Sequence, residues 1–193
     1  MRLTELSNWL MTWKTSGTLK AFKLAFNEWA TSLIFHVEQE DKYVTMPLIQ
    51  CTPSADNPSL GLADKVKDTM ITHEEEMHEE LLSGLEDVFA VLNEDIGSTS
   101  VITRTKQHLY GQVMTLRIVQ EDHLDTEEAL VLLMVERCLT DEQQLLAARE
   151  LLLDNAAADP RWVMNWISES LTDGERVLLA NLEARFQALP VPA

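Results

Sequence analysis

The sequence is short of basic residues and of long apolar runs. Its 15 Lys and Arg stand against 32 Asp and Glu, which leaves a net charge of -17. Such a chain repels phosphate backbones and anionic lipid surfaces, so we expect neither nucleic acid nor a membrane as a partner. No run of about 18 apolar residues could span a bilayer, and the first residues lack the apolar core of a secretory signal. We therefore expect a cytoplasmic protein.

Cysteine, glycine and proline are also scarce. Cys51 and Cys138 belong to no Cys-x-x-Cys pair, so the sequence suggests neither a zinc cage nor a disulfide framework. We predict that both cysteines are packing residues. The six glycines and six prolines gather mainly between apolar-periodic segments, as in the stretch from Pro53 to Gly61. They are expected to separate long helices.

Apolar residues recur every three or four positions, and no segment alternates with period two, which predicts an all-α fold. We expect helices over about 3–14, 18–49, 62–94, 100–137, 141–154, 160–170 and 173–189. Thr140 and Thr172 each begin a capping-box pattern, which supports the helices that follow them. Residues 1–193 are predicted to form a single domain, with a core bundle over about 1–137 and extra helices over about 141–189.

A local repeat carries the chemistry. The segments 36–41 and 123–128 match in residue type at five of six positions, and Val44 and Val131 continue the register. On a helix, a His and a Glu four residues later lie about 40° apart around the axis and about 6 Å apart along it. Both side chains can therefore reach one ion. Each copy supplies one nitrogen and one carboxylate, from His36 with Glu40 and from His123 with Glu127.

Both histidines of the repeat follow apolar stripes at helical steps. The stripe that contains His123 consists of Val113, Leu116, Val119 and Leu130, and the stripe before His36 contains Trp29 and Leu33. A carboxylate that points into a core costs several kcal/mol unless it is paired or bound to metal. Glu40 and Glu127 therefore need a common explanation, and a shared cation supplies one.

A third helix offers two more histidines, of which one shares the core direction. His78 lies in line with Ile71, Leu81, Leu82, Leu85 and Phe89, whereas His73 is rotated from it by about 140°. His78 is thus the predicted ligand, and His73 is a less well placed candidate. Glu74 lies one turn before His78 and either accepts its ring N–H or binds the metal itself. His108 is about 22 Å along its helix from His123 and cannot serve the same centre.

Imidazoles and carboxylates from facing helices are the ligands of carboxylate-bridged di-iron and di-manganese centres, and zinc is chemically compatible. Iron is favoured because two carboxylate-bearing helices can hold two ions close together, with open positions for O2, peroxide or NO. We therefore predict a small polar cavity around iron. Its ligands would be His36, Glu40, His78, His123 and Glu127.

These residues resemble the hemerythrin-like HHE cation-binding family, whose motif has His-x-x-x-Glu on two helices and a His on a third. The stretch HVEQEDKYVTMPL from His36 looks like the family's second helix, the residues 123–135 look like its fourth, and His78 with ELLSGLEDVFAVL is similar to its third. The segments 162–167 and 171–175 resemble the C-terminal helices of HHE domains in eukaryotic iron-sensing ubiquitin ligases. The resemblance implies an up-down four-helix bundle with additional C-terminal helices.

The family usually carries a further His on its first helix, but no His precedes His36 here. Either the chain begins inside that helix or the site lacks this ligand, and Glu5 is a candidate to take its place. The resemblance implies a non-haem iron protein that binds or senses O2, iron or a related small oxidant. Two alternatives stay open: a metal-free bundle that acts through protein contacts, and a di-iron enzyme that acts on peroxide or NO. The oligomeric state is likewise open.

Overall fold

The computed structural model describes residues 16–51, 60–93, 99–187 and 189. Within these ranges every regular element is a helix, so the all-α prediction is confirmed. The predicted helix over 3–14 and the candidate ligand Glu5 lie outside the described residues. Among the described helices, none is both long and apolar enough to cross a membrane.

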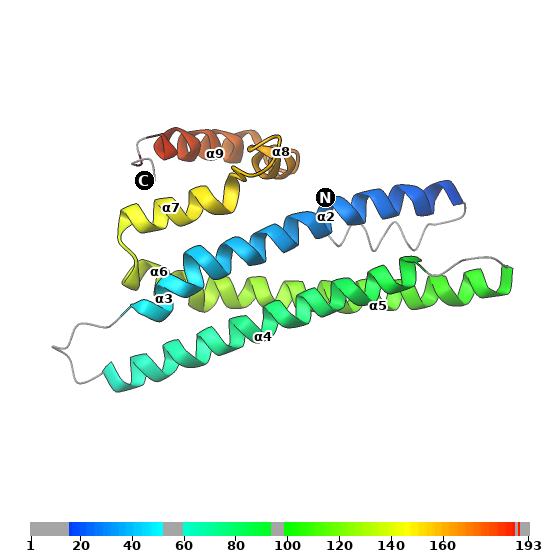
Figure 1. The fold of residues 1–193 in the computed structure, drawn as a ribbon, viewed down its shortest axis with the longest axis horizontal. Coiled ribbons are helices and arrows are strands. Elements are labelled where there is room, and N and C mark those ends of the chain that lie inside the picture. The colour runs from blue at the N-terminus through cyan, green and yellow to red at the C-terminus, as the bar shows by residue number, and fades with distance from the viewer. Residues whose placement is uncertain (1–15, 52–59, 94–98, 188, 190–193) are drawn as a thin grey trace. The chain divides into compact units, whose positions relative to one another are not determined.

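Each predicted helix after residue 15 has a counterpart in the structure (Figure 1). The elements in chain order are α2 (Ser16–Glu40), the π-helical turn η1 (Asp41–Thr45), α3 (Met46–Gln50), α4 (Leu60–Asn93), α5 (Thr99–Thr126), the π-helical turn η2 (Glu127–Val131), α6 (Leu132–Cys138), α7 (Asp141–Leu152), α8 (Trp162–Ser168) and α9 (Asp173–Phe186). The predicted helices over 18–49 and 100–137 are therefore each interrupted by one π-helical turn.

Contacts divide the chain into two compact units. Unit 1 comprises Met1–Ile34 and Thr72–Ala129, and unit 2 comprises Phe35–Ile71 and Leu130–Ala193. The boundaries fall inside α2, α4 and η2. Each unit has its own buried apolar residues, and the assignment of the chain to a single domain stays a prediction.

The core of unit 1 is built on an aromatic cluster and on leucines and valines of α4 and α5. The Phe26 ring lies 5.7 Å from Phe22, 5.6 Å from Trp29 and 5.3 Å from Phe89, the last in an edge-to-face arrangement. Helices α4 and α5 approach closely at Gly84, where an added Cβ would lie 2.9 Å from Cδ1 of the buried Leu116. A small residue is therefore needed at that position of α4.

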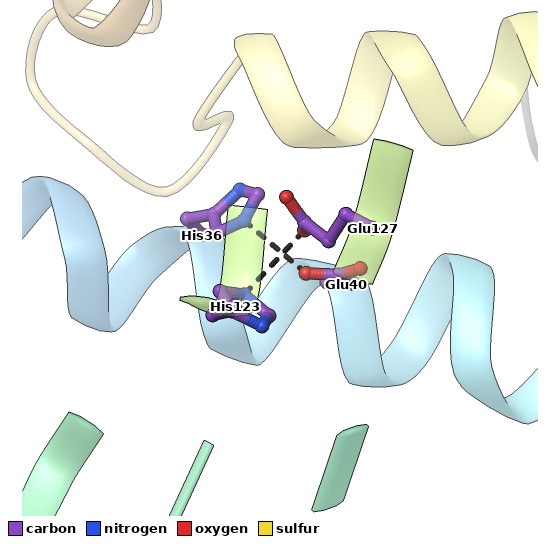
Figure 2. Close-up of side chains that lie close together, drawn as sticks. All are labelled: His36, Glu40, His123 and Glu127. Carbon is purple, nitrogen blue, oxygen red and sulfur yellow. Dashed lines mark ion pairs between the residues drawn. The ribbon is translucent and has the colours of Figure 1, made fainter. Parts of the chain in front are cut away.

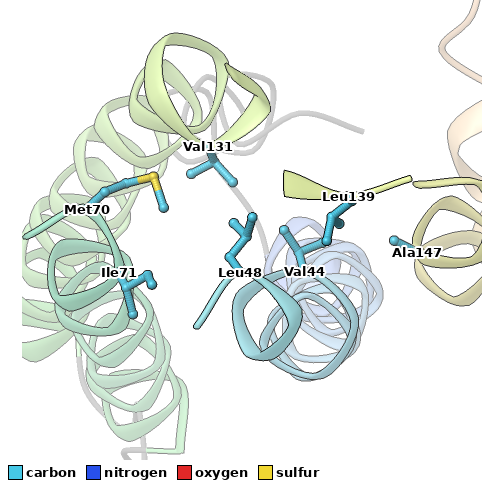
Figure 3. Close-up of a cluster of buried hydrophobic side chains, with 7 residues drawn as sticks. All are labelled: Val44, Leu48, Met70, Ile71, Val131, Leu139 and Ala147. Atoms are coloured by element: carbon cyan, nitrogen blue, oxygen red, sulfur yellow. The ribbon is translucent and has the colours of Figure 1, made fainter. Parts of the chain in front are cut away.

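The core of unit 2 gathers residues from both copies of the repeat (Figure 3). The cluster consists of Val44, Leu48, Met70, Ile71, Val131, Leu139 and Ala147. Val44 and Val131 occupy equivalent positions of the repeat, and Val135, the equivalent of Leu48, packs against the same cluster. The repeat is therefore also a repeat of packing positions.

The C-terminal helices of unit 2 begin as the capping pattern predicts. Thr140 and Thr172 each accept a hydrogen bond from the backbone N–H three residues later, and the side chain of that residue accepts one in return. Helix α7 packs against η1 and against α9. The indole of Trp162 donates a hydrogen bond of 3.0 Å to Asp154 and its ring meets Phe35 edge-on.

Two residues expected on apolar stripes are exposed instead. Leu130 is 43% exposed, whereas its neighbour Val131 is 4% exposed. The prediction assumed a regular α-helix after His123, but the π-helical turn η2 inserts one extra residue and moves the buried position on by one. Leu82 is 37% exposed because the buried face of α4 runs through Leu81 and Leu85.

Candidate metal centre

Two helices of unit 1 bring three candidate ligands together. Glu74 and His78 lie one turn apart on α4, and His123 lies near the end of α5. One potential ligand atom from each of the three residues lies within 4.8 Å of the others. The imidazole rings of His78 and His123 meet edge to face at 4.9 Å. One imidazole from each helix and a carboxylate therefore face a common point.

The three side chains are almost completely buried. Glu74 is 2% exposed, His78 3% and His123 1%. Glu74 Oε2 lies 3.3 Å from Nδ1 of His123, but neither carboxylate oxygen accepts a well-formed hydrogen bond from the described residues. A buried carboxylate is costly unless its oxygens are paired or metal-bound. Glu74, like Glu40 and Glu127 in the sequence analysis, is therefore a carboxylate whose burial a bound cation would explain.

His123 faces a carboxylate on each side of its ring. Its Nδ1 points to Glu74, and its Nε2 lies 3.5 Å from Oε1 of Glu127 in the next turn (Figure 2). Glu127 is partly buried and is the first residue of η2. One ring nitrogen can therefore bind a cation while the other donates to a carboxylate, the arrangement that fixes the tautomer and orientation of metal-binding histidines.

In unit 2 the other copy of the motif repeats this pair. His36 Nε2 lies 3.2 Å from Oε2 of Glu40 one turn later on α2 (Figure 2). The Glu40 side chain is 5% exposed, whereas that of His36 is 36% exposed. The pair is followed directly by η1, just as the pair in unit 1 leads into η2. A π-helical turn thus begins directly after the first motif and at the last residue of the second.

The structure sorts the predicted residues of unit 1. His78 and Glu127 both lie close to His123, as expected. Glu74, which the sequence made a secondary candidate, groups with His78 and also contacts His123. His73 and His108 are both exposed. This agrees with the prediction that His73 is a less well placed candidate ligand and that His108 does not serve this centre. The convergence of His36 and Glu40 with these residues stays a prediction.

Sequence reasoning missed the π-helical turns and the central place of Glu74. The turns leave no simple signal, because an extra residue in a helix is recognised only from which side chains become buried. Glu74 did leave a signal. It lies three residues after Ile71 and three before Met77, both buried, and thus occupies a position on the apolar stripe of α4.

Comparison of the chain with family models, with curated proteins and with solved structures finds no match. The resemblance to hemerythrin-like proteins therefore rests on the motifs themselves. The case for a metal centre rests on the geometry and burial of the side chains described above.

Proposed function

We propose that this protein binds non-haem iron in an up-down four-helix bundle of the hemerythrin type and uses it to bind or sense O2 or a related small oxidant. The observation that carries the proposal is the Glu74 carboxylate, which is buried beside two imidazoles without a hydrogen bond from the described residues. A cation held by the two imidazoles, which are suitable ligands for iron, would offset the charge of this carboxylate, and Glu74 would in turn orient the His123 ring.

The repeat extends the proposed site to His36 and Glu40. In unit 2, equivalent residues of the two copies, Val44 and Val131, share one cluster. The motif histidines precede these valines by the same interval of eight residues in both copies. His36 and Glu40 are therefore retained as the candidate ligands that the second copy of the motif contributes.

The side chains have distinct tasks in this proposal. The carboxylates of Glu40 and Glu127 would bind the cation and offset its charge. Glu74 holds the His123 ring in place through Nδ1 while Nε2 stays directed to the side of Glu127. The bound iron would supply a redox-active centre with positions open to a small oxidant. The burial of His78 and His123 limits access of water to the site.

The position of His123 also favours the metal-free alternative. A doubly protonated imidazole could donate to Glu74 from Nδ1 and to Glu127 from Nε2, and would then serve as the counter-ion for both carboxylates. In that case the cluster is a structural ion triad and the protein acts through its surface. Removal or addition of metal would leave the stability of the fold unchanged.

Iron binding separates the two functions. The full chain is stripped with a chelator, titrated anaerobically with Fe(II), and freed of unbound metal before elemental analysis. We expect stoichiometric iron in the wild type and an absorption band that changes on exposure to O2. His123→Ala and His78→Ala should lose most of the iron, whereas the exposed controls His73→Ala and His108→Ala should keep it. Wild type without bound iron, or equal loss in His108→Ala, would refute the proposed site.

A further inference from the structure

The two cysteines of the chain lie side by side in unit 2. Cys51 caps the C-terminal end of α3 and Cys138 is the last residue of α6. Helix α3 packs against α6, and the neighbouring Cys51 thiol contributes to a raised pKa of Cys138. Cys138 also packs against the apolar cluster around Val44 and Val131. The prediction that both cysteines are packing residues therefore overlooks that they are partners.

The repeat explains why the cysteines meet. Cys51 lies fifteen residues after His36, and Cys138 lies fifteen residues after His123. The cysteines thus occupy equivalent positions, as do Val44 and Val131, which share the core of the same unit. Where two copies of a helix pack with equivalent residues facing each other, a cysteine in each copy becomes a dithiol pair. The equal spacing of fifteen residues between each motif histidine and its cysteine could therefore have predicted from the sequence that Cys51 and Cys138 are neighbours.

A buried lysine lies next to the thiols. Lys67 is 8% exposed, and its ammonium donates a hydrogen bond of 2.8 Å to the backbone carbonyl of Cys51. Its charge favours the thiolate form of Cys138. Burial has the larger effect and, together with the interaction with Cys51, raises the pKa of Cys138 to about 11. Cys138 is therefore protonated at neutral pH.

We propose that Cys51 and Cys138 form a redox-reactive dithiol, which hydroperoxides oxidise to an intramolecular disulfide. Disulfide formation requires two cysteines that lie close together, and the packing of α3 against α6 brings together the two helices whose C-terminal ends carry the cysteines. Zinc is a poor alternative occupant because it takes about four ligands, and among the described residues no third donor groups with the two thiols. The proposal is independent of the proposed iron site.

The reaction balances over two steps. The Cys51 thiolate attacks the distal oxygen of the hydroperoxide, the O–O bond breaks, and the released alkoxide takes up a proton, leaving a sulfenic acid on Cys51. The Cys138 sulfur then attacks the Cys51 sulfur, and its proton leaves with the hydroxide as water. Two thiols are oxidised by two electrons, and the hydroperoxide is reduced to an alcohol and water. We assign the resolving role to Cys138 because burial raises its pKa and keeps its thiol protonated at neutral pH.

The direct test uses the wild-type chain and needs no substitution. The reduced, folded protein is treated with hydrogen peroxide in the presence of a chelator, which removes iron-catalysed side reactions. We expect the intact mass to fall by two hydrogen atoms. After tryptic digestion without reductant, the peptide of residues 43–65 should be linked to the peptide of residues 138–149. Disulfide-linked dimers, or oxidation to sulfinic acid without a cross-link, would overturn the proposal.

Two further measurements test the fit to the fold and the assigned order. In glutathione buffers, the oxidation equilibrium should favour the disulfide by at least about tenfold more in the folded chain than in urea, because a disulfide that fits a fold stabilises it. An equal or lower value in the folded chain would refute the pair. In Cys138→Ser the sulfenic acid on Cys51 should be trapped by dimedone, and Cys51→Ser should give no trapped adduct. The reverse result would overturn the assigned order.

Discussion

Glu74 is one of three consecutive glutamates on α4, yet it is the only one of them that is buried. Its neighbours Glu75 and Glu76 are exposed, because successive residues of a helix point about 100° apart. The burial of Glu74 beside His123 makes it the residue on which the two readings of the cluster differ most. If a metal is bound, Glu74 orients the metal-binding His123 ring. In the metal-free cluster, Glu74 is one of the two carboxylates that pair with His123.

We therefore expect Glu74→Gln to weaken iron binding about 10- to 100-fold, the effect typical of removing a carboxylate that orients a metal-binding histidine. The metal-free variant should melt at or above the wild-type temperature, because a buried charge is removed while the shape is kept. Glu75→Gln on the same helix is the matched control and should change neither quantity. Anaerobic Fe(II) titration and thermal unfolding measure the two effects. Unchanged iron binding with a lower melting temperature would favour the ion triad.

The thiol of Cys138 should show its raised pKa in its reactivity. With a pKa of about 11 in place of 9.0, its thiolate fraction in the folded protein near pH 8 is about 100-fold lower than in the unfolded chain. Iodoacetamide should modify Cys138 correspondingly more slowly in the folded chain than in urea, as followed by the mass of the peptide of residues 138–149. Equal rates in both states would contradict the raised pKa.

The same shift has a consequence for stability. Between about pH 9 and pH 11 the unfolded chain loses the Cys138 proton while the folded chain keeps it. The free energy of unfolding should therefore fall as the pH rises through this window, because the folded state binds more protons. Cys138→Ser should lack this part of the decrease.

At the scale of elements, the π-helical turns decide which side chains reach the core. The turn η1 follows the first His-x-x-x-Glu motif and η2 begins at the Glu of the second, and η2 moves the buried position from Leu130 to Val131. Helices containing such turns are often found at functional sites, because the extra residue re-aims the side chains on both sides of it. Glu127 opens η2, so the direction of its carboxylate depends on this turn.

Paired alanine substitutions test η2. Val131→Ala should lower the free energy of unfolding by about 1.5–2.5 kcal/mol, since it removes buried methyl groups and leaves a cavity. Leu130→Ala removes a larger but half-exposed side chain and should cost less than about 1 kcal/mol. Urea denaturation with an unchanged m-value measures both. A larger loss for Leu130→Ala would show that a regular α-helix continues through residues 127–131.

At the scale of the whole molecule, the excess of acidic residues leads us to expect that stability depends on cations. The net charge of -17 adds repulsion to the cost of the buried carboxylates Glu40 and Glu74. A cation that binds only the folded chain stabilises it by about 2.7 kcal/mol at 100 times its dissociation constant. For a chain of this size, that corresponds to a rise in melting temperature of about 5–10 °C.

Replacement of both motif glutamates tests whether the proposed centre is the source of this effect. The metal-free Glu40→Gln/Glu127→Gln protein should be as stable as the wild type or more stable, and iron should not raise its melting temperature. The exposed neighbours provide a matched control, Glu38→Gln/Glu128→Gln, which should respond to iron like the wild type. If the wild type melts at the same temperature with and without saturating iron, the cation does not stabilise this fold and the metal-free alternative is favoured.

The helical fold and most candidate ligands follow from local pattern alone. Apolar spacing identified every described long helix, and the Thr140 and Thr172 capping boxes located the starts of α7 and α9. These features depend on interactions between residues that are close in the sequence, so they can be predicted from the sequence alone. The same reasoning distinguished the buried His78 from the exposed His73.

Only the tertiary structure decided which carboxylate and which sulfur a given residue meets. Glu74 contacts His123 across 49 positions of sequence, and Cys51 meets Cys138 across 87. Such contacts depend on how the helices pack against one another. A π-helical turn also moves every later side chain around the helix by one residue, and the sequence pattern does not reveal where this happens. The sequence by itself determined the helices and the His-x-x-x-Glu motifs they carry. Packing determined the partners, because burial and distance are properties of the folded chain.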